Sequence, residues 1–418
     1  MYPTQDQEKA LQRVQDWFRS PNSQRVFKLG GLAGTGKSSL IPWIHERLEL
    51  DVNYIQYVAP TNKAALVVQR RLNTAGMIAN ARTVHKVYYH KQERHCDECP
   101  LTETTKNICH GVSGYNQCGC TLDFNAKMES DARIKLVVCD ESSMIGREVY
   151  DDLLVACSPQ VKFLFIGDHG QLEAIEENIN LEKAFGKFNL MGRPDFILEE
   201  IQRQAADSPI LKLAYQARKG FPIEFGDFGH GVRKLRLADE LDFDFSNREL
   251  IGITYFAHVD KSNPHHKGRI GVNELNRIWR GNLGIKSVVP IVGERIVARE
   301  FIRRSGISKG TLGTILEIDQ KDHESYMVTV LLDDDRTYEG IVSSKQFYNN
   351  KPIWGMHHLD KWDYGYALTC HTAQGSEFES VVVFEPSKGF IKWLGAVSYS
   401  RWLYTAITRA KQNLLLVG

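Results

Sequence analysis

The most constraining feature of the sequence is a glycine-rich stretch, Gly31-Leu-Ala-Gly34-Thr35-Gly36-Lys37-Ser38. It follows the apolar run VFKLG and precedes SSLIPWIHERL, whose composition favours a helix. Closely spaced glycines let backbone N–H groups approach phosphates, and the N-terminus of a following helix adds a favourable dipole. The pattern predicts a phosphate-binding loop in which Lys37 reaches the β- and γ-phosphates and the Ser38 hydroxyl binds Mg²⁺. Further contacts in this loop are expected from Gly34, Thr35, Gly36 and Ser39.

Short apolar runs alternate with helical patterns along much of the chain. Continuous apolar strands separated by helices are typical of parallel sheets buried on both faces, so we expect an α/β fold. The predicted strands lie at 25–30, 54–60, 135–141, 162–168, 380–385 and 413–418, and helices are expected at 7–18, 62–72 and 272–281. Two stretches do not fit: 86–133 is polar and rich in Cys and His, and 286–358 contains short β segments with Gly turns, as in a small antiparallel barrel.

A nucleoside triphosphate site needs an acidic anchor at the end of a neighbouring strand. The segment LVVCDESSM supplies Asp140 and Glu141 directly after an apolar run. We expect Asp140 to hold Mg²⁺ through its water shell and Glu141 to orient and deprotonate the attacking water.

The charge balance limits the kind of nucleic-acid site that the chain can form. The 52 Lys and Arg residues nearly cancel the 51 Asp and Glu residues, which excludes a generally basic coat and leaves a local groove or patch. No stretch approaches 18 apolar residues, and the start MYPTQDQEKA is polar, so we expect a cytosolic protein without a membrane span.

Eight segments, in order, resemble the motifs of superfamily 1 helicases, and most closely those of the 5′→3′ branch that includes the phage Dda and RecD-type enzymes. The resemblance covers most of the chain apart from the two atypical stretches. Its segments are 4–7, 59–65, 82–85, 140–144, 167–172, 198–204, 367–378 and 404–410.

The resemblance implies two RecA-like domains that share one ATP and Mg²⁺ site. The first would comprise 1–85 and 134–190, and the second 191–285 and 359–418. A Cys-rich 1B subdomain would occupy 86–133, and an SH3-like 2B subdomain 286–358.

The resemblance also assigns roles to individual residues. Gln7 would read adenine, Gln171 would sense the γ-phosphate, and Arg203 and Arg409 would be arginine fingers. Around the nucleotide cleft it places Gln374, Gly375 and, at the ribose, Glu377. A single strand would be held by Pro60, Thr61, Asn62, Thr83, His85, Thr369 and His371. Candidate stacking aromatics, most of them expected to be core residues, are Tyr88, Tyr89, Trp354, Trp362, Tyr364 and Tyr366.

Five of the 8 cysteines lie between positions 96 and 120. The spacing Cys96-x-x-Cys99 followed by Cys118-Gly-Cys120 resembles a structural Zn²⁺ site with two close ligand pairs. Alternative ligands are His95, Cys109 and His110. A free-thiol loop and an iron–sulfur cluster remain alternatives. Cys139, Cys157 and Cys370 are expected to be small core residues.

These observations predict an ATP-dependent DNA helicase that translocates on single-stranded DNA and unwinds duplex DNA, with 5′→3′ polarity from resemblance alone. An RNA or RNA/DNA helicase and a nucleotide-switched binding module are the alternatives. Expected partners are single strands, strand junctions and replication or recombination proteins such as a single-strand-binding protein. A monomer in a bacterial or phage-infected cytosol is expected.

Overall fold

The computed structural model describes residues 2–89, 131–172, 188–201, 207–236, 250–257, 270–300, 302, 305, 307, 309–348 and 360–418. Two compact units are distinguished, one within Met1–Tyr88, Glu129–Gly271 and Leu368–Gly418, and the other within Tyr89–Met128 and Val272–Ala367. The predicted cysteine ligands, Arg203 and Trp354 lie outside the described residues.

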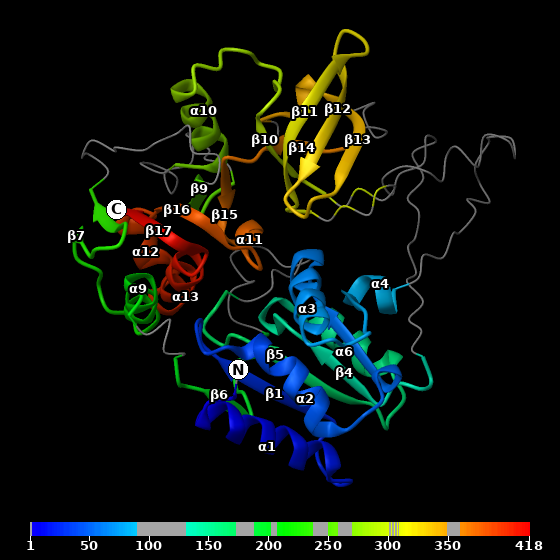
Figure 1. Cartoon of the computed structure of the whole chain (residues 1–418). Helices are drawn as coiled ribbons and strands as arrows, with labels where there is room; N and C mark the ends of the chain where they lie inside the picture. Colours follow the sequence, from blue (N-terminus) through cyan, green and yellow to red (C-terminus); the bar gives the residue numbers. More distant parts are fainter. Residues whose placement is uncertain are drawn as a thin grey trace, which may run out of the picture. The chain divides into compact units, whose positions relative to one another are not determined.

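The N-terminal sheet of the first unit is parallel throughout, as predicted from the apolar runs (Figure 1). Its strand order is β3-β2-β4-β5-β1-β6. The strands are β1 (Val26–Gly31), β2 (Ile55–Ala59), β3 (Ala81–Thr83), β4 (Leu136–Cys139), β5 (Lys162–Gly167) and β6 (Phe196–Leu198). Central strands β4, β5 and β1 are almost wholly buried, which explains why they read as continuous apolar runs.

Helices cover both faces of this sheet. The helices α1 (Gln5–Arg19), α2 (Leu40–Leu48) and α3 (Asn62–Thr74) share one apolar core with alternate residues of the strands. The other face receives α6 (Arg147–Ala156), whose Tyr150 ring lies 5.7 Å from that of Phe165. Because side chains alternate across a strand, Leu164 and Phe165 face opposite layers. A short helix, α4 (Val84–Tyr88), follows β3.

Both ends of α1 are fixed by side chains. Thr4 and Gln7 form a reciprocal capping box at its start. At its end, the Lys162 ammonium group donates to the carbonyl oxygens of Trp17, Phe18 and Ser20 at 2.8–3.0 Å. These bonds satisfy carbonyls that have no partner within the helix and tie α1 to the first residue of β5.

A second sheet in the same unit has the order β15-β9-β16-β17-β8-β7. Its strands are β7 (Gly226–Asp227), β8 (Val232–Leu235), β9 (Leu250–Thr254), β15 (Ala367–Thr369), β16 (Phe378–Phe384) and β17 (Ala410–Val417). The strands β9, β16, β17 and β8 are mutually parallel. The helices of this part are α9 (Pro209–Arg218), α11 (Cys370–Ala373), α12 (Lys388–Leu394) and α13 (Ala396–Ile407). Thus the α/β prediction with helix-flanked parallel sheets is confirmed.

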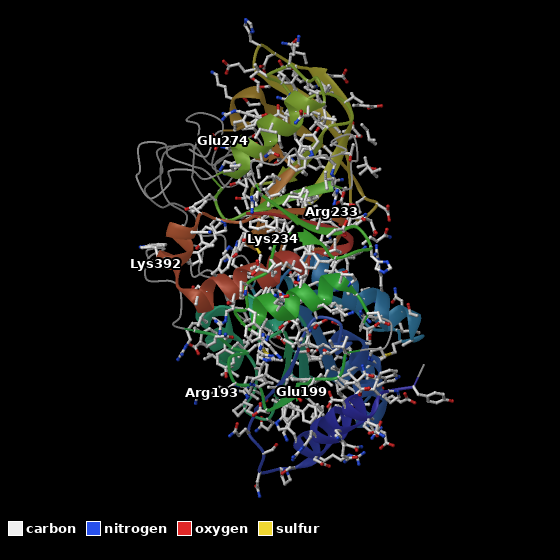
Figure 2. The ribbon with its side chains drawn as sticks, turned by 90° about the vertical axis from the view of Figure 1, so that its left-hand side faces the viewer. Arg193, Glu199, Arg233, Lys234, Glu274 and Lys392 are labelled. Carbon is white, nitrogen blue, oxygen red and sulfur yellow. The ribbon has the colours of Figure 1, made fainter. Side chains whose placement is uncertain are left out.

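The carboxyl ends of β8 and β16 are joined by a buried ion pair. Lys234 Nζ lies 2.8 Å from Glu385 Oε1, and both side chains are 8% exposed. Tyr399 donates to the other carboxylate oxygen at 2.9 Å. In Figure 2, Lys234 is labelled beside Arg233, its exposed neighbour on β8. Alternation along the strand therefore places one cation in the core and the next in solvent.

The second unit contains a helix and an antiparallel sheet of order β13-β12-β11-β10-β14. The elements are α10 (Val272–Asn282), β10 (Arg295–Ala298), β11 (Leu312–Gln320), β12 (Ser325–Leu332), β13 (Thr337–Ser343) and β14 (Trp362–Tyr364). The helix predicted at 272–281 and the short antiparallel strands are present. The strand β14 pairs with β10 and lies beyond position 358, while the SH3-like assignment stays a prediction.

A buried polar network joins α10 to this sheet. The Arg280 guanidinium binds Glu294 at 2.7 Å, and these side chains are 5% and 1% exposed. Asn276 donates to the Tyr364 carbonyl and accepts the amide of Ala367. Buried polar groups are stable when they are fully paired, so this network fixes how the helix packs on the sheet.

Within the described ranges, no helix is both long and apolar enough to cross a bilayer. The core assignments of Cys139, Cys157 and Cys370 are confirmed, because all three are buried and none belongs to a disulfide. Burial raises the thiol pKa of Cys139 and of Cys370 to about 12, which keeps both groups protonated.

Candidate nucleotide-binding site

The glycine-rich loop joins β1 to α2, as the sequence predicts. Gly34 and Gly36 have φ values of 83° and 74°, which L residues with side chains rarely adopt. A 3₁₀ turn at Lys37–Ser39 precedes α2. Pro42 is only the third residue of that helix, where a backbone N–H has no partner within the helix, so it causes no break.

Lys37 and the acidic strand ends meet beside this loop. Lys37 Nζ donates to the Leu32 carbonyl at 2.9 Å and lies 3.8 Å from Asp168 Oδ2. The Ser38 hydroxyl is hydrogen-bonded to Asp140, whose carboxylate also accepts the Glu141 amide at 2.9 Å. A hydroxyl and a carboxylate in contact form an oxygen donor set that suits Mg²⁺ and its waters. These positions fit the expected roles of Lys37, Ser38 and Asp140.

Glu141 lies two residues after the end of β4 and has a left-handed conformation with φ of 50°. Burial and the neighbouring charge of Asp140 raise the pKa of Glu141 to about 7. Glu141 Oε2 and Gln171 Oε1 are buried atoms for which the described residues supply no hydrogen-bond partner. A buried polar atom without a hydrogen-bond partner destabilises a fold. These two atoms are therefore consistent with a site at which a polar ligand supplies the partner.

The 168–172 segment is held by residues far along the chain. Tyr404 donates to Asp168 Oδ2, and Thr405 Oγ1 accepts the Leu172 amide at 2.9 Å. Gln374 donates to the Leu172 carbonyl at 3.0 Å. Asp168, Tyr404 and Thr405 received no role from the sequence, although they lie in the segments GDHGQL and YTAITRA.

Arg409 is buried near the end of the 404–410 segment. Its guanidinium donates to the carbonyls of Thr405 and Ser376 and to the Thr408 hydroxyl, each at 3.0 Å. Its positive charge acts on Glu141 and opposes the rise in that carboxyl's pKa. Arg409 therefore lies within electrostatic reach of the acidic strand end, and its donors are engaged within this region.

Other predicted nucleotide contacts surround the loop. The Gln7 side-chain amide donates to the Thr35 carbonyl at 3.1 Å and its oxygen accepts the Thr4 amide, so it braces the loop. The Ser39 hydroxyl accepts from Arg71 at 2.6 Å. Gly375 has φ of 75°, and a β-carbon there would meet the Thr61 hydroxyl at 3.4 Å. Glu377 is exposed.

Comparisons with known proteins show the family to which the chain belongs. A family described as an AAA domain matches residues 4–230, and a UvrD-like helicase C-terminal domain matches residues 364–417. The chain is 25% identical over 405 residues to the ATP-dependent RecD2 DNA helicase of Deinococcus radiodurans, which covers 94% of this chain and 47% of that protein. The chain belongs to the superfamily 1B helicases.

Two further proteins illustrate the range of this family. The ATP-dependent DNA helicase Dda of Enterobacteria phage T4 is 26% identical over 281 residues, covering 65% of this chain and 56% of that protein. The Bacteroides Pif1 helicase, solved in complex with ADP-AlF3 and single-stranded DNA, has a TM-score of 0.52 at 16% identity, covering 100% of this chain and 92% of that chain. This last likeness concerns the fold alone. The chain spans about half the length of the RecD2 and Dda relatives.

The three threonines predicted to hold a single strand share one local structure in this helicase fold. Thr83 and Thr369 are the last residues of β3 and β15, and Thr61 lies two residues after β2. Each hydroxyl accepts a backbone amide at the start of the following helix at 3.2 Å. A hydroxyl that accepts such a bond still has a hydrogen to donate. The neighbours Pro60, Asn62 and His371 are partly exposed, and His85 is exposed.

Four of the aromatic side chains considered for base stacking are instead core residues. Tyr88, Trp362, Tyr364 and Tyr366 are at most 5% exposed. The expectation that most of these aromatics are core residues is therefore confirmed for these four, whose ring faces no base can reach in this structure. Burial is the ordinary outcome for large aromatic side chains.

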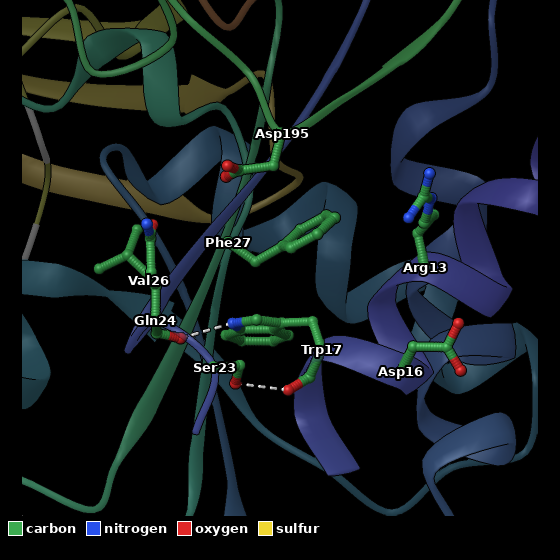
Figure 3. A pocket seen from close by; sticks show the side chains of 8 residues that line it. All are labelled: Arg13, Asp16, Trp17, Ser23, Gln24, Val26, Phe27 and Asp195. Atoms are coloured by element: carbon green, nitrogen blue, oxygen red, sulfur yellow. Dashed lines mark hydrogen bonds between the residues drawn. The ribbon is translucent and has the colours of Figure 1, made fainter. Parts of the chain in front are cut away.

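A separate cavity of about 270 Å³ lies beside α1 (Figure 3). Its wall includes Trp17, Phe27 and Asp195, with Arg13 and Asp16 at the helix. Trp17 Nε1 donates to the Gln24 carbonyl, and Ser23 donates to the Trp17 carbonyl. The cavity shares no lining residue with the nucleotide site.

The predicted zinc ligands receive no structural test, since Cys96, Cys99, Cys118 and Cys120 lie outside the described residues. The same holds for the alternates Cys109, His95 and His110 and for the second predicted arginine finger, Arg203. Among the residues that the structure describes, no group of three or more His, Cys, Asp or Glu side chains could hold a metal ion.

Proposed function

We propose that this chain is an ATP-dependent DNA helicase that translocates on single-stranded DNA in the 5′→3′ direction and unwinds duplexes. The observation that carries the proposal is one cluster in which Lys37, Ser38 with Asp140, and Glu141 lie beside the 168–172 segment. That segment is bonded in turn to Gln374, which lies between α11 and β16, and to Thr405, which lies on α13 before β17. The names of the RecD2 and Dda relatives support the same activity.

The residues of this cluster have separate roles in phosphoryl transfer. Lys37 binds the β- and γ-phosphates, while Ser38 and Asp140 hold Mg²⁺, which neutralises charge on the phosphates. Glu141 accepts a proton from the attacking water, which a carboxyl with a pKa near 7 does well at neutral pH. Gln171 senses the γ-phosphate, and Arg203 and Arg409 stabilise the negative charge that develops on it.

Hydrolysis is coupled to movement through the 168–172 segment. Its amide and carbonyl at Leu172 are bonded to Thr405 and Gln374, so a change at the γ-phosphate reaches residues adjoining both Arg409 and Gly375. A β-carbon at Gly375 would contact the Thr61 hydroxyl, a predicted strand contact. The nucleotide site and the proposed strand contacts are thereby connected through neighbouring residues.

The single strand is bound through its phosphates. The hydroxyls of Thr61, Thr83 and Thr369 lie at helix N-termini, where amides and the helix dipole attract anions. The neighbouring Pro60, Asn62, His85 and His371 complete the proposed groove. Such contacts hold any sequence, because phosphates carry no base information.

The direct test is steady-state ATP hydrolysis with and without single-stranded DNA. We expect strong stimulation by DNA and loss of turnover in Lys37→Ala, with Lys9→Ala, an exposed lysine on α1, as the matched control. Turnover that is indifferent to single strands would contradict the motor function. Stimulation by RNA in place of DNA would favour an RNA helicase, and nucleotide binding without turnover would favour a switch.

Polarity, metal content and assembly need separate measurements. Duplexes with a 5′ or a 3′ single-stranded tail decide direction, and we expect unwinding from the 5′ tail. A structural Zn²⁺ in the Cys-rich insertion should appear as one equivalent of metal in purified protein, and its absence would end that proposal. We further propose a cytosolic monomer that acts at single/double-strand junctions alongside a single-strand-binding protein.

A further inference from the structure

The phosphate end of the nucleotide site contains the hydroxyl of Tyr404, a buried residue of α13. This hydroxyl donates to Asp168 Oδ2 and accepts the backbone amide of Ala33 at 2.8 Å. Ala33 belongs to the glycine-rich loop, whose amides are the groups that hold phosphates in loops of this type. A residue from the far end of the chain therefore uses an amide that a nucleotide would need.

The direction of both bonds follows from the chemistry of a tyrosine hydroxyl. Burial, together with the negative charge of Asp168, raises the pKa of Tyr404 well above its ordinary value. The hydroxyl thus keeps its single proton at neutral pH and gives it to Asp168. The bond to Ala33 must use an oxygen lone pair, which is the same kind of acceptor that a phosphate oxygen presents.

The neighbours of this hydroxyl locate it along the expected nucleotide. Lys37 Nζ lies 2.9 Å from the Leu32 carbonyl, next to Ala33 in sequence, and 3.8 Å from Asp168. Lys37 is the residue that reaches the terminal phosphates in such loops. The Ala33 amide and the Lys37 ammonium group therefore lie at the end of the proposed site where the terminal phosphates, rather than the ribose, would bind.

We propose that the Tyr404 hydroxyl and a γ-phosphate oxygen compete for the Ala33 amide, so that a triphosphate must displace the hydroxyl from Ala33 whereas a diphosphate leaves it in place. The inference rests on the proposed ATP site and makes Tyr404 a positioning residue within it. A γ-phosphate oxygen and the tyrosine oxygen compete for one N–H group. ADP has no oxygen at that position, so it does not compete.

Displacement has a defined consequence for the 168–172 segment. Tyr404 is bonded to Asp168 at its start, and the adjacent Thr405 is bonded to Leu172 at its end. A shift of this turn of α13 moves both attachment points together. Binding of the γ-phosphate thereby shifts α13 and Arg409, which lies just beyond this helix, whether or not hydrolysis follows.

The test is equilibrium binding of a fluorescent non-hydrolysable ATP analogue and of fluorescent ADP to the full chain and to Tyr404→Phe. The variant loses one oxygen and keeps the packed ring. Without its competitor, the ATP analogue should bind about two- to twelvefold more tightly, the range expected from the net value of one hydrogen bond. Affinity for ADP should change by less than about twofold.

Tyr399→Phe is the matched control. Tyr399 lies on the same helix, donates to the carboxylate of Glu385 at 2.9 Å and stacks on Trp402. Its hydroxyl is thus bonded to Glu385 and not to the glycine-rich loop. Deleting its hydroxyl should leave the ratio of the two affinities unchanged. Thermal unfolding of both variants reports whether either substitution disturbs the fold.

An unchanged affinity ratio in Tyr404→Phe, or an equal shift for both nucleotides, would overturn the inference while leaving the ATP site intact. If the wild-type chain bound neither nucleotide, the proposed function would fall as well. Wild-type protein labelled at tyrosine ¹³Cζ gives a measurement that needs no variant. One buried tyrosine signal should shift with the ATP analogue and stay in place with ADP, and a shift with both would again overturn the inference.

Discussion

Glu141→Gln should separate the chemical step from nucleotide binding. Removing a general base that acts on the attacking water costs about 10²–10⁴ in rate, so kcat for DNA-stimulated ATP hydrolysis should fall by about that factor. The substitution keeps the size of the side chain and removes a charge whose ionisation is opposed by burial and by Asp140. It should therefore leave the thermal unfolding temperature unchanged or slightly higher.

The same substitution should leave ATP affinity unchanged or increased. Glu141 and Asp140 place two carboxylates beside the position of the phosphates, and removing one negative charge lowers repulsion of an anion. Steady-state hydrolysis gives kcat, and equilibrium titration with a fluorescent ATP analogue gives the affinity. Both are compared with wild type under saturating single-stranded DNA.

Glu49→Gln is a suitable control for the loss of a carboxylate. Glu49 also has a left-handed conformation, with φ of 53°, but it is exposed and pairs with Arg19 on the surface at 3.2 Å. Exposed pairs of this kind contribute little, so neither turnover nor stability should change measurably. A decrease in kcat of less than about tenfold in Glu141→Gln, or a decrease matched by lost ATP binding, would refute the assignment of Glu141 as the base.

Three further substitutions test other parts of the chain. Arg280→Met should lower the free energy of unfolding in chemical denaturation by about 3–5 kcal/mol, because it leaves the buried Glu294 carboxylate without its partner. Adding Glu294→Gln should restore part of the lost stability. Strictly additive effects of the two substitutions would show that the two residues do not interact. Burial lowers the pKa of His371 to about 4, so the unfolded chain takes up a proton first and stability falls as pH drops from about 6.5 towards 4. His371→Asn should flatten this part of the stability profile, and an unaltered profile would contradict the shift. Ser38→Ala should raise the Mg²⁺ concentration for half-maximal ATP turnover by at least about tenfold, and an unchanged Mg²⁺ titration would exclude the hydroxyl as a ligand.

Local sequence patterns predicted the elements that carry the nucleotide site. The run before Gly31 forms β1, and the run before Asp140 forms β4, because central parallel strands bury both faces and so need continuous apolar residues. Phosphate loops and acidic strand ends depend on neighbouring residues, so their chemistry is visible in a single stretch of sequence.

Contacts between distant residues could not be predicted in this way. Tyr404 and Asp168 are separated by 236 positions, and neither segment alone indicates that a tyrosine hydroxyl meets the glycine-rich loop. The same limitation applies to Trp362 and Tyr364, whose exposure depends on the pairing of β14 with β10. Aromatic composition indicates that such residues are large and apolar, but tertiary pairing decides whether a ring faces solvent.

Several polar groups of the proposed nucleotide site are paired with one another, and this has a consequence for ATP binding. Lys37 contacts a carbonyl and Asp168, Arg409 donates three hydrogen bonds to nearby oxygens, and the Ala33 amide is bonded to Tyr404. Buried cations without partners would be strongly unfavourable, so these contacts stabilise the folded site. ATP binding must replace each of these contacts with a contact to phosphate. The free energy of ATP binding is therefore the difference between two sets of similar bonds. Substitutions in the 404–410 segment should accordingly change nucleotide affinity in either direction, according to which set they weaken.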